Sequence, residues 1–239
     1  VVLVPVGGGG LASGVAIALK ALRPGVEVVG VQVERFAPYP ASLASGTAVE
    51  VAAAPPSIAD GIAVKRPGAL TLALIERWLD DVVVVSEDAI AEAMVVLLER
   101  AKLVVEGAGA VGVAALRSGV VAPAPRGVTA VVLSGGNVDA GLLATVARRH
   151  ETQVGRRLVV LTRLPDRPGE LARLLAVVAD EGANLVELGH VREGLDLHVR
   201  ESAVQLVLET RGRAHAAQVL AAIERAGYAA RPVRAVGAP

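Results

Sequence analysis

Four consecutive glycines follow an apolar run at the start of the chain and precede a segment with helical spacing. Residues 1–6 are expected to form a buried strand, and residues 11–22 a helix that ends before Pro24. A glycine loop between strand and helix leaves backbone N–H groups free to converge on an anion at the positive end of the helix dipole. Because glycine has no Cβ, the backbone can also approach a phosphate closely. The run therefore predicts a phosphate site, although a tight turn is the alternative. The candidate residues are Gly7, Gly8, Gly9, Gly10 and Leu11.

A dinucleotide fingerprint fits these glycines poorly. It requires the spacing G-x-G-x-x-G, and Leu11 or Ala12 falls where a glycine is needed. Glu34 does follow the second predicted strand, about 20 residues on, where an acid binds ribose in such sites. A nucleotide-binding dehydrogenase therefore stays open as an alternative, whereas a Walker loop is excluded because no Gly-Lys-Ser/Thr follows.

The first part of the chain alternates apolar strands with helices. Strands that are apolar on both faces indicate a parallel sheet covered on both sides, so the predicted fold class here is α/β. Residues 35–68 are rich in proline and are expected to be irregular or to hold short helices. The further strands are expected at 27–33, 82–85 and 128–133, and the further helices at 70–79, 87–102, 107–117 and 140–149, with Ser86 as an N-cap.

The pattern changes after residue 149. Residues 150–156 are polar and are expected to form a linker between a first domain, 1–149, and a second, 157–235. The second domain reads strand, helix, strand, strand, helix, strand, which is the ferredoxin-like order βαββαβ of an α+β fold. Its strands alternate, as in Val204, Leu206 and Leu208, which suits a sheet covered on one face.

Composition excludes several classes of protein. The 24 basic residues balance 24 acidic ones, so no charge excess favours nucleic acid or anionic lipid. There is no cysteine, hence no disulfide framework or thiol nucleophile, and this fits the cytoplasm. Residues 1–19 carry no charge, but Pro5 and the glycines argue against a membrane span or signal peptide. We expect a cytoplasmic protein without nucleic-acid or membrane partners.

Two more motifs follow predicted strands or open predicted helices. Ser134 stands after the strand at 128–133, and the carboxyl ends of parallel strands face one crevice, so Ser134 and the glycine loop are expected to line one pocket. A serine hydroxyl there can share a hydrogen bond with a heteroaromatic ring nitrogen. Glu106 precedes a small-residue helix start and is expected at the rim of the same pocket. The alternatives are a helix N-cap for Ser134 and a simple first-turn acid for Glu106.

These motifs resemble those of the threonine ammonia-lyase (threonine dehydratase) family of pyridoxal-phosphate enzymes, fold type II. The resemblance is carried, in the family's order, by residues 5–11, 57–68, 106–110 and 133–139. It implies a pyridoxal 5'-phosphate cofactor held by the glycine loop, Ser134 and Glu106. It also implies β-elimination from threonine or serine, which gives 2-oxobutanoate or pyruvate and ammonia. A serine racemase-like enzyme and a non-catalytic regulatory or assembly remnant are the alternatives.

Residues 157–235 resemble an ACT domain. Asp166, Pro168 and Gly169 match its first loop and helix start, and Asn184 and Leu185 match the start of its second strand. We expect this second strand to lie next to the first strand of the domain. The resemblance implies that a small amino acid, branched-chain or related, binds there as an effector, and that the protein is a homo-oligomer. A dimerisation module without a ligand is the alternative.

The family's main catalytic group has no counterpart among these residues. The resemblance implies a Schiff-base lysine in an upstream half, but Lys20 and Lys102 fall in predicted helices and Lys65 belongs to another motif. The chain also opens on Val1 inside a strand. We therefore expect a fragment that is inactive alone.

A cation site is not expected either. It would combine Glu34 with a second acid a few residues later, where Pro38 and Pro40 stand instead. No metal is therefore predicted.

Overall fold

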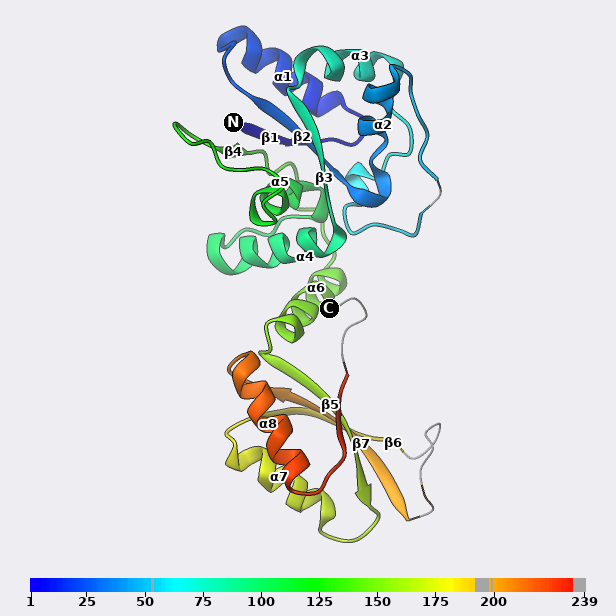
Figure 1. Cartoon of the computed structure of the whole chain (residues 1–239), viewed down its shortest axis with the longest axis vertical. Helices are drawn as coiled ribbons and strands as arrows, with labels where there is room; N and C mark the ends of the chain where they lie inside the picture. The colour runs from blue at the N-terminus through cyan, green and yellow to red at the C-terminus, as the bar shows by residue number, and fades with distance from the viewer. Residues whose placement is uncertain (53, 192–197, 199, 234–239) are drawn as a thin grey trace. The chain divides into compact units, whose positions relative to one another are not determined.

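The computed structural model describes residues 1–52, 54–191, 198 and 200–233 of the 239-residue chain. The chain divides into two compact units, Val1–Val146 and Ala147–Pro239. The first unit holds a parallel sheet between helices, and the second holds an antiparallel sheet with helices packed on it (Figure 1). Among the described residues, no helix combines the length and the apolar character needed to cross a membrane.

The sheet of the first unit has its four described strands in the order β3-β2-β1-β4, all parallel. The register places Val2 beside both Val28 and Ala130. Strands β2 and β3 lie on one side of β1, and β4 lies on the other, so the strand order reverses at β1. In open parallel sheets, ligands bind at the carboxyl ends of the strands beside such a reversal. The strands are β1 (Val2–Pro5), β2 (Val28–Val33), β3 (Asp81–Val85) and β4 (Ala130–Val131).

Helices cover both faces of this sheet, which confirms the predicted α/β fold. α1 (Gly10–Leu22) and α3 (Ala69–Trp78) pack on the face that carries Val4 and Val6. α4 (Glu87–Val96) and α5 (Gly107–Arg117) pack on the face that carries Leu3, Val31 and Val33 (Figure 1). Ser86 caps α4 as predicted, since its hydroxyl accepts a hydrogen bond from the backbone N–H of Ala89 at 3.2 Å.

The described part of the stretch at 35–68 holds an α-helix and two single turns, the first of which begins at Glu34. α2 (Pro38–Ser45) begins on a proline, whose fixed φ suits the first helical position. The 3-10 turns are Glu34–Phe36 and Asp60–Ile62. A π-type turn, Leu97–Ala101, extends α4 toward Lys102, where the helix was expected to end.

Two boundaries differ from the sequence prediction. The strand expected at 128–133 pairs as a strand only at Ala130–Val131, and Thr129, just before it, accepts the N–H of Ala124 at Oγ1, 2.8 Å away. α6 (Ala140–Gln153) continues past residue 149, so part of the segment expected to be a linker is helical. No glycine or proline interrupts residues 150–153, and the helix ends before Gly155, which has a φ of +76°.

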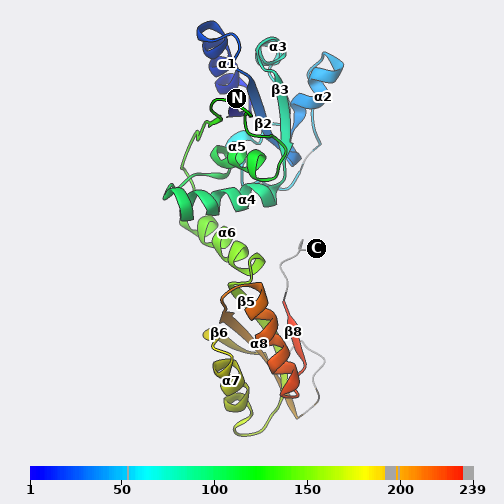
Figure 2. The same ribbon diagram turned by 60° about the vertical axis from the view of Figure 1, so that its left-hand side comes forward.

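The second unit has the ferredoxin-like order βαββαβ, as predicted. Its antiparallel sheet has the strand order β6-β7-β5-β8. α7 and α8 lie side by side on one face of this sheet (Figure 2). Ile223 of α8 is buried in one cluster with Val160 and Leu206 of the sheet. The elements are β5 (Arg157–Pro165), α7 (Glu170–Asp180), β6 (Asn184–Val191), β7 (Glu201–Glu209), α8 (Arg213–Arg225) and β8 (Ala230–Pro232).

Candidate functional site

The glycine loop joins β1 to α1 and leaves several amides free. Gly9 is the N-cap of α1, with a φ of +94°, and no side chain caps the helix. The first helical hydrogen bond runs from the N–H of Ser13 to the carbonyl of Gly9 at 2.9 Å. The N–H groups of Gly10, Leu11 and Ala12 therefore have no acceptor within the helix. They lie at the positive end of the helix dipole, where an anion is stabilised.

The four glycines serve two purposes. A Cβ on Gly9 would overlap Tyr39 Oη, and one on Gly7 would lie 3.0 Å from the Cα of Ile62, so packing requires glycine at both positions. A Cβ on Gly8 or Gly10 would meet nothing within 4 Å. Packing within the chain therefore does not explain why glycine stands at positions 8 and 10. A ligand that approaches the backbone does, and the loop therefore fits a bound phosphate.

A pocket of about 270 Å³ opens over the loop. Its walls come from the ends of β1 and β4, the start of α5 and the turn at 60–62. The structure thus brings together all the residues that the sequence predicted for the cofactor. The pocket is lined by Pro5, Gly7, Gly8, Gly9, Gly10, Leu11, Gly61, Ile62, Glu106, Ala108 and Ser134.

Glu106 and Ser134 reach the pocket because α5 packs closely on the loop after β4. The backbone N–H of Glu106 donates to the carbonyl of Gly135 at 3.1 Å. A Cβ on Gly135 would overlap Glu106 Oε1, and one on Gly109 would lie 2.9 Å from the Gly135 carbonyl oxygen. Small residues therefore hold the two segments in backbone contact. The carboxylate of Glu106 and the hydroxyl of Ser134 therefore line the same pocket.

Sequence reasoning missed the residues beneath the loop. Tyr39 Oη lies 2.9 Å from the carbonyl oxygen of Gly8 and 3.0 Å from Thr71 Oγ1. Gln32, fully buried, donates from Nε2 to the carbonyl of Val6 at 3.2 Å and accepts the N–H of Tyr39 at Oε1, 3.1 Å away. Gln32 carries the only polar side chain of β2, and a single polar residue in an apolar strand is a feature that the sequence shows.

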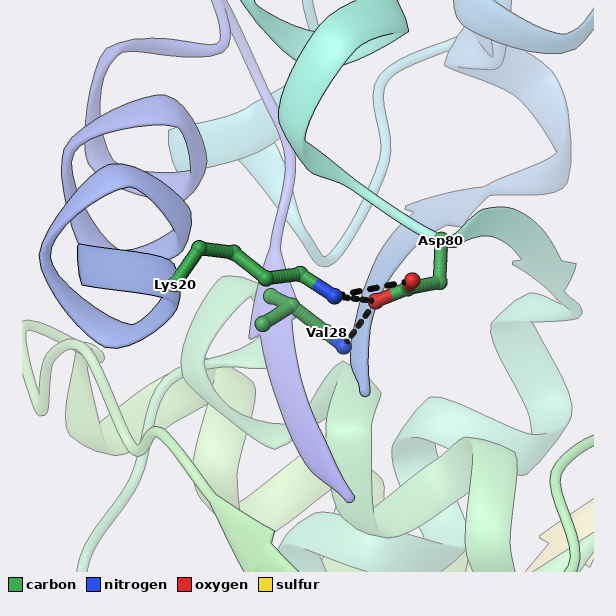
Figure 3. Close-up of polar contacts among 3 residues, drawn as sticks. All are labelled: Lys20, Val28 and Asp80. Atoms are coloured by element: carbon green, nitrogen blue, oxygen red, sulfur yellow. Dashed lines mark hydrogen bonds and ion pairs between the residues drawn. The ribbon is translucent and has the colours of Figure 1, made fainter. Parts of the chain in front are cut away.

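The three lysines all belong to the described residues, and none lines the pocket. Lys20 Nζ contacts both carboxylate oxygens of Asp80, at 2.9 and 2.7 Å, and Asp80 Oδ2 also accepts the N–H of Val28 at 2.6 Å (Figure 3). Burial by itself raises the pKa of Asp80, but the bonds from Lys20 and Val28 outweigh it and hold that pKa below its ordinary value. Lys102 Nζ donates to the carbonyl of Glu99 at 2.8 Å. Lys20 is thus structural.

Glu34 lies outside the pocket lining. Its Oε1 accepts the backbone N–H of Glu87 at 3.4 Å, at the start of α4. The acid that a ribose site would use is therefore not among the pocket's walls. Within the described residues, no group of three or more histidine, aspartate or glutamate side chains is placed to hold a metal ion.

The predicted effector residues are not brought together within one chain. Asp166, Pro168 and Gly169 follow the end of β5, whereas Asn184 and Leu185 begin β6. Asn184 pairs with Glu209, which pairs with Arg157 at the beginning of β5. Nine residues of β5, at about 3.3 Å each, put roughly 30 Å between the two groups. The expectation that β6 neighbours β5 was wrong because β7 lies between them.

The chain is similar to a known protein family and to curated proteins. The family described as pyridoxal-phosphate dependent enzyme matches residues 1–135. An L-threonine ammonia-lyase of Thermotoga maritima is 42% identical over 233 residues, which cover 98% of this chain and 57% of that protein. The chain thus spans little more than half the length of this curated relative.

Two solved structures are also similar to this chain. The crystal structure of a threonine deaminase from T.th. is similar with a TM-score of 0.54 and 41% identity, over 58% of this chain and 50% of that one. Maize serine racemase is similar with a TM-score of 0.54 and 34% identity, over 63% of this chain and 46% of that one.

Proposed function

The chain belongs to the pyridoxal-phosphate-dependent enzyme family, and on that premise we propose that the protein carrying it is a threonine ammonia-lyase. The reaction converts threonine to 2-oxobutanoate and ammonia, and serine to pyruvate and ammonia. The observation that carries the proposal is the pocket where the glycine loop, Glu106 and Ser134 converge. The 42% identity to the Thermotoga maritima L-threonine ammonia-lyase supports the choice of reaction.

The chain's own residues would hold the cofactor. Pyridoxal phosphate supplies a ring that stabilises negative charge at the Cα of a bound amino acid. The amides of Gly10 and Leu11, which line the pocket, would bind its phosphate, with the helix dipole behind them. Ser134 would face the ring nitrogen, where a neutral hydroxyl does not force that nitrogen to be protonated. Glu106 would offer a carboxylate acceptor at the rim.

The proton at Cα needs a base that these residues do not supply. The pocket lining contains no lysine. We therefore propose that the Schiff-base lysine belongs to a part of the protein outside these 239 residues, and that the chain alone binds ligand without turnover.

The second unit would regulate or assemble the enzyme. We propose that residues 157–235 form an ACT domain, and its βαββαβ order supports this. A small amino acid would bind between two copies, in a homo-oligomer in the cytoplasm. An assembly role without a ligand is the competing proposal.

The reaction is tested on the full-length enzyme with three assays. We expect 2-oxobutanoate from threonine, pyruvate from serine, and little D-serine from L-serine. The racemase assay is included because maize serine racemase is 34% identical over the aligned region. D-serine formed faster than either oxo acid would make the protein a racemase, and no product in any assay would favour the regulatory remnant.

The cofactor site is tested separately by filling the loop. Gly8→Val and Gly10→Val place side chains where the structure has open space, so the fold should be retained. We expect affinity for pyridoxal phosphate to fall about 100-fold in each variant, comparable to losing one hydrogen bond to a charged group. Gly14→Val is the matched control, because Gly14 is also exposed on α1 with nothing within 4 Å of its added Cβ and lies outside the pocket lining. Equal affinity in all three variants would contradict the site.

A further inference from the structure

We propose that Tyr39 is a positioning residue for phosphate binding, because its hydroxyl fixes the Gly8–Gly9 peptide so that the N–H of Gly9 faces the phosphate. This inference rests on the proposed cofactor site. Tyr39 lies on the interior side of the glycine loop and would affect the site from there. Tyr39 is not in the pocket lining, and it would act only through the backbone of the loop.

The hydroxyl of Tyr39 is directed at the loop from the protein interior. Tyr39 is fully buried in α2, and its O–H donates to the carbonyl oxygen of Gly8 at 2.9 Å. Thr71 Oγ1, 3.0 Å away, is its second neighbour and itself reaches the carbonyl of Gly68 at 3.1 Å. Burial raises the pKa of Tyr39, against a smaller opposite effect of the Thr71 bond, so the hydroxyl keeps its proton at neutral pH.

The geometry of a peptide bond converts this contact into an orientation of the site. In a trans peptide the C=O and the following N–H point in opposite directions. No described peptide bond is cis. Because the Gly8 carbonyl points to Tyr39, the N–H of Gly9 points away from Tyr39. Gly8 and Gly10, on either side of Gly9, have nothing within 4 Å of an added Cβ.

Gln32 holds the tyrosine in place. Its Oε1 accepts the backbone N–H of Tyr39 at 3.1 Å, and its Nε2 donates to the carbonyl of Val6 at 3.2 Å. One buried amide therefore ties the start of α2 to the residue before the glycine loop. Gly9 must lack a side chain for the contact to form, because a Cβ there would overlap Tyr39 Oη.

The test is Tyr39→Phe in the full-length enzyme freed of cofactor, with pyridoxal phosphate and pyridoxal as probes. Removing the hydroxyl frees the Gly8–Gly9 peptide to rotate, so we expect affinity for pyridoxal phosphate to fall about tenfold. Affinity for pyridoxal, which has no phosphate, should change less than about twofold. Tyr228→Phe is the matched control, since Tyr228 is the chain's other tyrosine and belongs to the second unit.

Two results would overturn the proposal. Unchanged affinity for pyridoxal phosphate in Tyr39→Phe would show that the hydroxyl does not orient the loop. An equal loss for both probes would show a merely structural role. Failure of the unmodified enzyme to bind pyridoxal phosphate would instead contradict the proposed function, so the two failures are distinguishable.

A measurement on the unmodified 239-residue chain covers the case in which Tyr39→Phe does not fold. Inorganic phosphate is added while the backbone amide resonances are followed by NMR. We expect the Gly9 amide to shift together with those of Gly10 and Leu11, and the Gly14 amide to stay in place. Shifts at Gly10 and Leu11 with an unmoved Gly9 would overturn the proposal.

Discussion

Two helices of this protein begin in almost the same way and are surrounded very differently. α1 starts after Gly9, with φ 94° and ψ −10°, and α7 starts after Gly169, with φ 88° and ψ −14°. Neither has a side-chain cap, and both close their first turn with a normal bond, from Ser13 N–H at 2.9 Å and from Arg173 N–H at 3.0 Å. Local backbone geometry does not distinguish them.

The surroundings do distinguish them. Gly9 lies against Tyr39, Thr71 and Ile75, and other segments complete a pocket above it. Gly169 has nothing within 4 Å of an added Cβ, and the first turn of α7 carries Glu170, paired with Arg173 at 3.1 Å. α1 has no acid in its first turn. Of these two helix starts, the one at α1 therefore lines a pocket and lacks a first-turn carboxylate, which is why the phosphate site is proposed there.

The largest expected effect compares the same substitution at both helix starts. Gly9→Ala forces a Cβ into a left-handed position and into Tyr39, so we expect a loss of about 3 kcal/mol in unfolding free energy. Gly169→Ala should lower the unfolding free energy by only about 1 kcal/mol, the cost of a left-handed backbone at a residue with a Cβ. Urea unfolding followed by fluorescence of Trp78, which lies in the first unit, and by circular dichroism measures both. Equal losses would mean that the buried surroundings of Gly9 do not constrain it.

A smaller effect is expected at the other end of α1, where Lys20 contacts Asp80 (Figure 3). Asp80→Ala removes that ion pair and the bond to the N–H of Val28, and should cost about 1 kcal/mol, since the aspartate side chain is 40% exposed. Lys20→Met removes only the ion pair and should cost about half as much. Phosphate binding should stay unchanged in both.

The pH dependence of this contact follows from the lowered pKa of Asp80. A carboxyl with a depressed folded-state pKa stabilises the fold above its ordinary value of 3.8 and loses that contribution as the pH falls through the folded value. The difference in stability between the unmodified chain and Asp80→Ala should therefore be constant near neutral pH and shrink below about pH 4. A difference that grows on acidification would contradict the assignment.

What the sequence predicted well was local. Strand, glycine loop and helix follow each other directly, and Ser86 caps α4 through a residue three positions away. The convergence of Gly7–Gly10 with Ser134 followed from a general rule on parallel sheets. By contrast, Tyr39 meets Gly8 across 31 positions, from a segment expected to be irregular, and nothing in residue spacing shows such a contact.

The position of β6 in the sheet was equally hidden. Asn184 was expected on the strand next to β5, whereas β7 lies between β5 and β6. Because β5 and β6 both run antiparallel to β7, they are parallel to each other, so Asp166 after the end of β5 and Asn184 at the start of β6 lie at opposite ends of the sheet. The pattern of apolar and polar residues indicates which residues form strands. The order of the strands depends instead on which apolar faces pack together across the whole unit.

The prediction with no expected effect on stability concerns the amino-acid site proposed for the second unit. Residues about 30 Å apart in one chain can contact one small ligand only if they come from two copies. Asp166→Ala and Asn184→Ala should each abolish binding of valine or isoleucine by the 239-residue chain, measured by calorimetry with threonine and serine as further ligands. An equal mixture of the two variants should regain about a quarter of the sites, because half of the dimers are mixed and one of their two sites is intact. Binding by either single variant would contradict a shared site, and no heat from the unmodified chain with any of the four amino acids would leave the second unit with an assembly role.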